Sequence, residues 1–416
     1  MSSPGSFASL RMTAKVHSMH RYRALVLIGV AELLGMSLWF SASAIAPALK
    51  AEWALTDAAA SWLTLAVQLG FVAGTLVSAV LNLPDVMSTR VLFSVSAFLG
   101  AAANAALATL IHEAGPGIAL RFLTGFFLAG VYPPGMKIMA SWFREGRGMA
   151  LGVLVGGITL GKAFPYLVNA IGSSNWRVNV LAVSGLAVAG GLVALLFVRD
   201  GPFAAPAARF DPRQVARVFR NRGVRLADFG YFGHMWELYA MWLWVPVFLR
   251  ASFAAQGQPP KLAEASSFLV IGCGAVGCVA AGVLADRIGR TTVTSWAMAI
   301  SGACCLAIGL LFDASPAVLL TVAAIWGATV VADSAQFSAC VTELSDPQYI
   351  GTALTIQTCV GFLLTMVSIE LVPAMVNLVG WRWAFAVLAP GPLLGVVAMQ
   401  RLRRLPEAAK IAGGRR

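Results

Sequence analysis

"ELLGMSLW" (Glu32–Trp39) and "ELYAMWLW" (Glu237–Trp244) are two stretches of this chain that share Glu, Leu, Met, Leu and Trp in one register, 205 residues apart. Each glutamate lies in strongly apolar surroundings, where an ionisable side chain is costly. A chain that places the same costly residue twice, half its length apart, is typical of an internal duplication. We therefore expect two related halves, each with a carboxylate in its first apolar segment.

The apolar residues around these stretches are gathered into long runs. The chain has 416 residues, of which 59% are hydrophobic and only 12% are charged, too few to cover a soluble protein of this length. A helix needs about 20 apolar residues to cross a bilayer core of about 30 Å. Twelve runs reach about this length, at residues 22–46, 60–82, 91–111, 116–140, 148–171, 177–198, 224–250, 265–285, 291–312, 315–341, 350–373 and 381–401. We predict an all-α polytopic membrane protein with 12 transmembrane helices.

The basic residues indicate the orientation. With both termini in the cytoplasm, 23 of the 30 Lys and Arg residues fall on the cytoplasmic side and five on the outer side, as the positive-inside rule requires. The net charge of +12 then has anionic lipid headgroups as its counterpart, and we expect no nucleic-acid partner. We predict a multi-pass protein, monomeric, with both termini cytoplasmic.

Further matched segments divide the chain at its longest polar stretch. "NWR" (Asn175–Arg177) and "GWR" (Gly380–Arg382) open the sixth run of each half, and "GMAL" at 148 and "GTAL" at 351 open the fifth. Six spans is an even number, so the repeats are parallel, as in transporter halves related by an axis along the membrane normal. We predict a cytoplasmic N-terminal tail, a six-helix bundle, a cytoplasmic linker, a second six-helix bundle and a cytoplasmic C-terminal tail, at residues 1–21, 22–198, 199–223, 224–402 and 403–416.

The sequence offers little for enzyme or cofactor chemistry. All six cysteines fall in spans of the second half, without a CxxC or His-paired spacing, and we interpret them as small packing residues. We find no nucleophile–base pair, metal-ligand cluster or nucleotide-binding motif in the sequence. We therefore expect neither an enzyme nor an ATP-driven pump, and no cofactor or metal.

Three segments carry a family resemblance. "GVLADRIGR" (Gly282–Arg290) is similar to the loop motif between the second and third helices of each half in the major facilitator superfamily, and "RFLTGFFLAG" (Arg121–Gly130) resembles that family's fourth-helix Arg–Gly motif. The corresponding first-half segment, "LNLPDVMSTR", keeps an Asp and an Arg but lacks the glycines. The resemblance covers essentially the whole chain and implies two pseudo-symmetric six-helix bundles. It also implies a cytoplasmic gate made of Asp85, Arg90, Asp286, Arg287 and Arg290.

Two longer stretches point to a branch of that family. "KIMASWFREGRGMALG" (137–152) and "GHMWELYAMW" (233–242) are loosely similar to the bacterial nitrate/nitrite or cyanate-type porters, which implies a bacterial inner (cytoplasmic) membrane. Nitrate porters use an arginine in the second helix and another in the eighth. The corresponding runs here contain Gln68 and no arginine, so we do not expect nitrate as the substrate.

Polar and ionisable side chains inside the spans are the candidate site residues, because they are costly unless they serve a solute pathway or satisfy one another. Each also has a structural interpretation as a packing or ion-pairing group, and the sequence leaves that alternative open. The candidates for substrate binding or proton coupling are Glu32, Trp39, Arg121, Lys162, Tyr166, His234, Glu237, Trp244, Asp333 and Gln336.

The resemblance suggests where the main candidates lie. The superfamily lines its central cavity with the first and seventh helices, which places Glu32 and Glu237 on opposite walls of one cavity, with tryptophans and a tyrosine around Glu237. Lys162 belongs to a polar stripe at helical spacing that should face the bundle interior, where it either neutralises an anionic substrate or pairs with a carboxylate. Arg121 either snorkels to the interface or takes part in proton coupling.

We interpret the chain as a secondary active transporter that moves a small solute across the inner membrane by alternating access. Its expected partners are a small-molecule substrate, an organic anion on the strength of the intramembrane cations, and protons. The alternatives are a membrane receptor or scaffold that keeps the fold without transport, and a multidrug-type efflux antiporter that uses the aromatic side chains.

Overall fold

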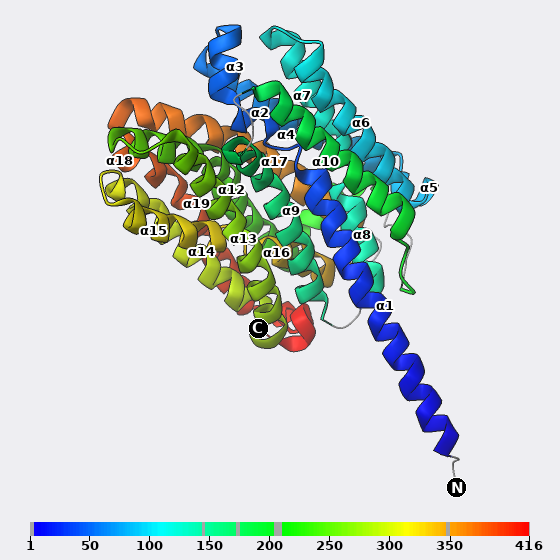
Figure 1. Ribbon diagram of the computed structural model, residues 1–416. Helices are drawn as coiled ribbons and strands as arrows, with labels where there is room; N and C mark the ends of the chain where they lie inside the picture. Colours follow the sequence, from blue (N-terminus) through cyan, green and yellow to red (C-terminus); the bar gives the residue numbers. More distant parts are fainter. Residues whose placement is uncertain (1–3, 144–145, 172–174, 204–209, 347–349, 416) are drawn as a thin grey trace.

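A computed structural model describes residues 4–143, 146–171, 175–203, 210–346 and 350–415, with side chains from residue 20 onward except those of residues 57, 58, 85 and 212. Within these ranges the chain is helical throughout and contains no strand, so the predicted all-α polytopic class is confirmed (Figure 1). The Asp85 side chain, one of the predicted gate residues, lies outside the described residues.

The first half contains six spans. They are α1 (Pro4–Met36) continued by α2 (Ser41–Ala44), α4 (Asp57–Val80), α6 (Thr89–Thr109), α7 (Ala114–Leu128) continued by α8 (Tyr132–Trp142), α9 (Arg147–Ile171) and α10 (Trp176–Phe197). The short helices α3 (Ala46–Trp53) and α5 (Leu83–Val86) lie in the connections between spans. The linker carries η1 (Pro212–Gln214) and α11 (Val215–Arg220).

The second half repeats this plan. Its spans are α12 (Arg222–Ala255), α13 (Pro260–Ile288), α14 (Arg290–Ala307) continued by η2 (Ile308–Leu311), α15 (Pro316–Thr329) continued by α16 (Ser334–Leu344), α17 (Ile350–Val379), and α18 (Trp381–Ala384) with η4 (Phe385–Leu388) and α19 (Pro390–Arg403). The chain ends in η5 (Pro406–Gly414).

The described chain contains 11 helical segments long and apolar enough to cross a membrane. The predicted run at 22–46 is divided among the second part of α1, a turn at residues 37–40, and α2. With this interrupted segment the order of the elements agrees with the twelve predicted runs.

The fourth span of each half is broken in its middle. The breaks cover residues 129–131, between α7 and α8, and residues 330–333, between α15 and α16, at corresponding positions of the two halves. Pro133 and Pro134 follow the first break, where a proline at the start of a helix has no N–H bond to lose. The break at residues 37–40 has no counterpart in α12, which is continuous from Arg222 to Ala255.

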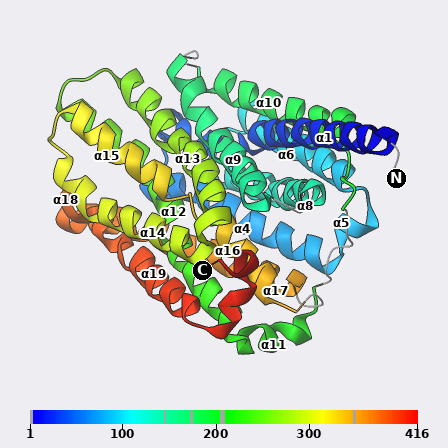
Figure 2. The same cartoon turned by 90° about the horizontal axis from the view of Figure 1, so that it is seen from below.

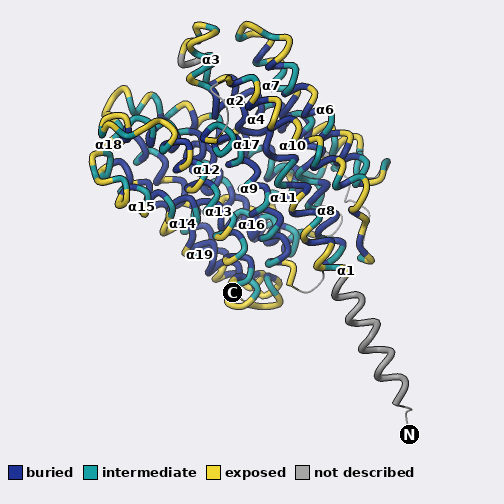
Figure 3. The backbone as a smooth tube through the Cα atoms, in the orientation of Figure 1, coloured by how far each residue is buried: buried dark blue, intermediate teal, exposed yellow. Residues whose placement is uncertain are grey.

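Both termini lie toward one end of the bundle, which we call the terminal face (Figure 1). Seen from that end, α9 and α13 lie side by side in the middle of the molecule while α10, α15 and α19 lie on its perimeter (Figure 2). Buried backbone is concentrated along the middle of the spans, and the exposed segments gather at the connections (Figure 3). The centre of the bundle is therefore where side chains of both halves meet.

Candidate functional site

The first span is interrupted beside the centre of the bundle. α1 ends at Met36 and α2 begins at Ser41. A broken helix leaves backbone carbonyls without an N–H partner, and in the bilayer core each such group costs several kcal/mol unless another donor reaches it. The Leu38 carbonyl accepts from the Ser41 backbone N–H at 3.4 Å and from the Ser41 hydroxyl at 3.0 Å, and the carbonyls of both Leu38 and Trp39 also receive a donor from a side chain of another helix, α7.

Arg121 of α7 is this donor. Its Nη2 donates to the Trp39 carbonyl at 2.5 Å, and its Nη1 donates to the Leu38 carbonyl at 3.2 Å. Nη1 also bonds to Ser41 Oγ at 3.0 Å and Asn104 Oδ1 at 2.8 Å, and Nε donates to the Leu63 carbonyl at 3.2 Å. All five acceptors are neutral oxygens, so the guanidinium serves as a multiple cap for the broken helix.

The snorkelling interpretation of Arg121 is therefore wrong. The side chain is 0% exposed and reaches inward, because the carbonyls of the broken helix offer it more hydrogen bonds than the interface would. By bonding to the Trp39 carbonyl, Arg121 also fixes the backbone that carries the Trp39 ring.

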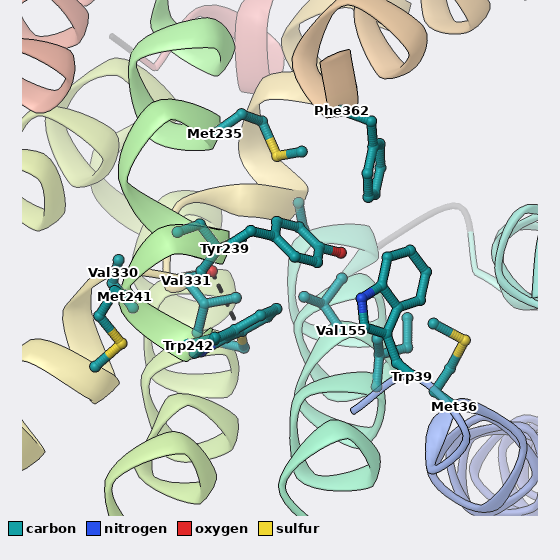
Figure 4. Close-up of a cluster of buried hydrophobic side chains, with 14 of the residues drawn as sticks. Met36, Trp39, Val155, Met235, Tyr239, Met241, Trp242, Val330, Val331 and Phe362 are labelled. Atoms are coloured by element: carbon teal, nitrogen blue, oxygen red, sulfur yellow. Dashed lines mark hydrogen bonds between the residues drawn. The ribbon is translucent and has the colours of Figure 1, made fainter. Parts of the chain in front are cut away.

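The Trp39 ring forms one wall of an aromatic cage around Lys162. The Lys162 ammonium lies 4.2 Å from the centre of the Trp39 ring, 4.5 Å from that of Tyr239 and 4.8 Å from that of Trp242, and it donates a hydrogen bond to the Tyr239 hydroxyl. Trp39 and Lys162 belong to the first half, whereas Tyr239 and Trp242 belong to α12. Figure 4 shows the Trp39 ring directed toward Tyr239 and Trp242 across the boundary between the halves. Cations attract the faces of such rings, by about 2 kcal/mol or more where water is excluded.

The cage adjoins a small central cavity of about 30 Å³. This volume has room for water and excludes an organic solute in this conformation. Its polar lining consists of Tyr132, Thr159, Lys162, Tyr231, Tyr239 and Ser334. Phe362 of α17 completes the wall and stacks with Phe71 of α4 at 4.6 Å between ring centres.

Glu32 lies on α1 two turns before Trp39. It is 0% exposed, and neither carboxyl oxygen has a hydrogen-bond partner among the described residues. The carboxyl group rests against the backbone of Gly135 on α8, where a Cβ atom would lie 1.7 Å from Oε1. Glu32 and Lys162 interact electrostatically between α1 and α9, but the described residues show no ion pair within 4.0 Å for either of them. The chain thus holds a buried carboxyl group beside, and not paired with, a buried ammonium group.

Glu237 does not face Glu32 across the cavity, and this positional expectation is wrong. Its Oε1 accepts from Trp326 Nε1 and Cys305 Sγ, and its Oε2 accepts from Ser301 Oγ at 2.9 Å, all within the second half. The reason is helix geometry. Tyr239 and Trp242 follow Glu237 by two and five residues, which at about 100° per residue puts them about 200° and about 140° around α12 from it. The face that bears the cage therefore points away from the glutamate.

Three other predicted residues form polar contacts outside the cavity. His234 Nδ1 lies 2.9 Å from Asp333 Oδ1, and both side chains are 1% exposed, at the break between α15 and α16. Gln336 does not reach the cavity, because its Oε1 accepts from Arg290 Nη1 at 2.7 Å. His234 and Asp333 thus form one buried pair, and Gln336 bonds to Arg290 instead of lining the cavity.

Tyr166 and Trp244 also lie away from the cavity lining. Tyr166 is buried on α9, one turn beyond Lys162. Trp244 Nε1 donates to the Ile369 carbonyl of α17 at 2.8 Å. Pro373 cannot supply the N–H that would normally bond to that carbonyl, so the indole replaces the missing donor.

At the terminal face, Asp286 bridges the two halves. Its Oδ2 accepts from the Met149 backbone N–H at 3.1 Å, in the first turn of α9, where the helix dipole favours a negative charge. Gly148 is required there, because a Cβ atom would lie 2.4 Å from Asp286 Oδ1. Among the other predicted gate residues, Arg287 is exposed and Arg90 is partly buried at the start of α6.

Arg290 does not bond to Asp286. Its guanidinium forms two hydrogen bonds with Glu343 of α16, at 3.1 Å and 2.8 Å, so that it joins helices of the second half only. Glu343 was not predicted as a site residue. It lies in "VTELSD", at the expected cytoplasmic end of the tenth span, where an acidic residue opposite a basic loop would have been the signal.

Small residues let α9 and α13 approach closely between the halves. Gly148, Gly152 and Gly156 recur every four residues on α9, as do Gly274, Cys278 and Gly282 on α13. A Cβ atom at Gly152 would lie 2.5 Å from the Cys278 carbonyl oxygen, and one at Gly282 would lie 2.4 Å from that of Gly148. This spacing is typical of closely packed membrane helices. The close contact joins the two halves on the side of the cavity toward the terminal face.

The two halves are also in contact toward the opposite face. Thr365 of α17 donates to Gln68 Oε1 of α4 at 2.6 Å. Arg250 of α12 donates to the Ala44 carbonyl at the end of α2 at 3.3 Å and forms an ion pair with Glu264. Contacts between the two halves therefore lie on both sides of the cavity.

Tyr239 and Trp242 were noted in the sequence only as aromatic neighbours of Glu237. Their place in the cavity lining could have been predicted from the angular positions of the side chains around α12. A face that contains Met235, Leu238, Tyr239 and Trp242 carries the large side chains of the cavity lining, whereas Glu237 lies on the other side.

The comparisons with known proteins agree with this geometry. The solved structure of the proton:xylose symporter XylE, bound to 6-bromo-6-deoxy-D-glucose, superimposes with a TM-score of 0.74 over 92% of this chain and 96% of XylE, at 13% sequence identity. A curated relative, the uncharacterized transporter ESBP6 of Saccharomyces cerevisiae, is 24% identical over 241 residues. That match covers 55% of this chain and 35% of the yeast protein, so the chain spans about a third of its length.

The family model of the Major Facilitator Superfamily matches residues 27–369 and 270–415. Together these ranges include the break in the first span, the aromatic cage and the contacts that Asp286, Gln68 and Arg250 make between the halves. The chain therefore belongs to the Major Facilitator Superfamily.

Proposed function

We propose that this transporter moves a small organic anion by alternating access and couples that movement to protons through Glu32. The observation that carries the proposal is Lys162, a buried ammonium group between the two halves, held by aromatic rings and without a carboxylate partner within 4.0 Å among the described residues.

An anion is the ligand that this arrangement favours. A charged side chain inside the bilayer is costly, and the attraction of three rings offsets only part of that cost. A carboxylate that entered the cavity would form a charge-assisted hydrogen bond with Lys162, which is about twice as strong as one between neutral groups. The hydroxyl groups of Tyr132, Tyr231 and Ser334 line the same cavity and are available as further donors.

Glu32 supplies a means of proton coupling. In this conformation its carboxyl oxygens have no hydrogen-bond donor in the part of the chain that the structure describes, so we expect this conformation to hold the neutral, protonated carboxyl group. When the halves separate and water enters, the carboxyl group releases its proton and the carboxylate is then drawn to Lys162. The substrate anion and the Glu32 carboxylate compete for one ammonium group, so substrate binding and proton binding favour one another.

Alternating access then requires that each gate opens in turn. On the terminal face, the bond between Asp286 and the first turn of α9 must break, and on the opposite face the bonds of Gln68 with Thr365 and of Arg250 with Ala44 must break. We place the terminal face in the cytoplasm, because the basic residues of the tails and the linker gather there.

A multidrug-type efflux antiporter is the second candidate. The aromatic side chains of Trp39, Phe71, Tyr239, Trp242 and Phe362 form one connected group, which suits an amphipathic compound. In that case the substrate would stack on the rings, and Lys162 would not bind it directly. A receptor or scaffold without transport is the third candidate.

A ligand screen on purified protein distinguishes these candidates. Small carboxylates and amphipathic cations are tested by thermal shift, and the hits are tested for substrate-dependent proton flux in proteoliposomes. For a carboxylate, Lys162→Gln should raise the apparent Kd about tenfold or more, whereas Lys261→Gln, at an exposed position, should leave it unchanged. Amphipathic hits whose affinity is unaffected by Lys162→Gln would favour the efflux antiporter. Binding without flux would favour a receptor.

The remaining finer assignments rest on the sequence. We propose a bacterial origin, the nitrate/nitrite or cyanate-type branch, an inner-membrane location, a monomer, and two bundles at residues 22–198 and 224–402 on the strength of the quoted segments and charges.

A further inference from the structure

The outer surface of the second half contains a furrow between α12 and α19. It has a volume of about 490 Å³ and is lined by Leu226, Phe229, Trp236, Leu394, Val397 and Arg401 among others. The two helices touch through glycines, since a Cβ atom at Gly233 would lie 2.3 Å from the Gly391 carbonyl oxygen. Glycine has no side chain to fill the line of contact, so a hollow remains between the flanking apolar side chains. α19 lies on the perimeter of the bundle, where the furrow faces the bilayer (Figure 2).

The length of the furrow matches one leaflet. Leu226 and Trp236 line its two ends on α12 and are ten residues apart, a distance of about 15 Å along a helix. This is half of a bilayer core of about 30 Å. At the upper end Trp236 Nε1 donates to the Val387 carbonyl at 3.1 Å, which fixes the indole as the end wall. The apolar part of the furrow therefore runs from the middle of the bilayer to the terminal face.

Four exposed arginines stand at the terminal-face end. Arg222 and Arg225 precede Leu226 and Phe229 by one helical turn on the same face of α12, and Arg404, directly after the end of α19, follows Arg401 by three residues. Arg225 donates one N–H to the Phe219 carbonyl at 3.2 Å. None of the four has a carboxylate partner within 4.0 Å among the residues that the structure describes. Their positive charge is not neutralised by the described part of the chain.

We propose that the furrow is a binding site for an anionic glycerophospholipid of the leaflet at the terminal face. Its acyl chain lies in the furrow against Phe229, Leu394 and Val397, and its phosphate is bound by Arg401 and the neighbouring arginines. Basic groups at the end of an apolar groove between transmembrane helices recognise anionic headgroups in this way. A second copy of the chain fits less well, because a twofold contact through this surface would place the same arginines opposite one another.

Native mass spectrometry of the full chain in a neutral detergent tests this proposal. The protein is titrated with phosphatidylglycerol and, separately, with phosphatidylcholine of the same acyl chains. We expect phosphatidylglycerol to be retained about tenfold more, and the Arg401→Gln/Arg404→Gln double variant to lose about tenfold of that retention. Arg403→Gln, at an exposed position of α19 outside the furrow, is the matched control and should retain lipid as the unmodified protein does.

A second pair of variants tests the apolar part. Leu394 is 68% exposed and lines the furrow, whereas its neighbour Leu393 is 58% exposed and does not line it. Leu394→Trp should fill the furrow and reduce retention at least fivefold, and Leu393→Trp should not. Equal retention of the two lipids, equal loss in both arginine variants or in both tryptophan variants, or a dimer that forms without lipid would each overturn the proposal.

Discussion

Replacing Arg121 with lysine should destabilise the first half of the transporter while keeping its charge. The guanidinium reaches five oxygen acceptors, which lie on four different segments of the first half. A lysine ammonium has three donors on a single atom, and the Ser41 hydroxyl also donates to the Leu38 carbonyl and to Asn104 Oδ1, so at least one of the five acceptors loses its partner. A buried acceptor left without a partner costs about 1–3 kcal/mol, so Arg121→Lys should lower the free energy of unfolding by about 1–3 kcal/mol.

The measurement is reversible unfolding of the purified protein in mixed micelles, with Arg177→Lys as the control. Arg177 is also an arginine bonded to another helix of the first half, but its partner Glu52 is exposed, and such a pair contributes little. Because Arg121 fixes the Trp39 backbone, Arg121→Lys should also weaken ligand binding at Lys162, which a general loss of stability alone would not do below the unfolding transition. A change in stability no larger than that of the control would refute the capping role.

Two further predictions concern close contacts of single side chains. Gly135→Ala should lower the free energy of unfolding by about 2 kcal/mol, because the new Cβ atom would lie 1.7 Å from Glu32 Oε1. Adding Glu32→Ala to the same protein should restore the stability. Gly115→Ala is the control and should lower the stability far less, because nothing lies within 4 Å of its Cβ position. A double variant as unstable as Gly135→Ala would contradict the contact. Asp286→Asn removes a charge worth about 0.5–1 kcal/mol at the start of α9, so spin-label distances across the terminal face should shift about twofold to fivefold toward the open form, without loss of folding. Asp313→Asn, at an exposed position, is the control, and identical distance distributions in the two variants would remove Asp286 from the gate.

The spans could be predicted from the sequence because the bilayer imposes one length and one composition on all of them. The same constraint explains the expectation that Lys162 faces inward, since lipid would reject an ammonium group. The structure places it in the aromatic cage, on the inward face of α9. The duplication was also visible, because spaced pairs such as the two octets keep their register.

The environments of the two glutamates could not be predicted from the octets alone. The octets match in letters, but a helix break begins inside the first, after Met36, whereas the second lies in a continuous helix. The break turns Trp39 into the cage, whereas on α12 the corresponding Trp244 bonds to a carbonyl of α17. Residues that correspond in the two octets therefore have different surroundings, because the local backbone differs.

The role of Arg121 lay beyond the sequence for another reason. Its acceptors are backbone carbonyls and neutral side chains of distant segments, and their residue types do not indicate that they bind a cation. Glu237 is different, because a count of about 100° per residue along α12 already separates it from Tyr239 and Trp242. The spacing of small residues on α9 and α13 is likewise a sequence pattern that predicts a close contact between helices.

In the proposed mechanism Glu32, and not Glu237, carries the proton while Lys162 binds the substrate anion. The most direct measurement is substrate-driven proton movement in proteoliposomes that contain Glu32→Gln or Glu237→Gln, with a carboxylate identified by the ligand screen. Glutamine keeps the shape of each side chain and removes its titration. We predict that Glu32→Gln abolishes proton movement and accumulation while substrate exchange at equal pH persists, and that Glu237→Gln preserves both with an unchanged pH profile. Proton movement that persists in Glu32→Gln, or that is lost only in Glu237→Gln, would contradict this account.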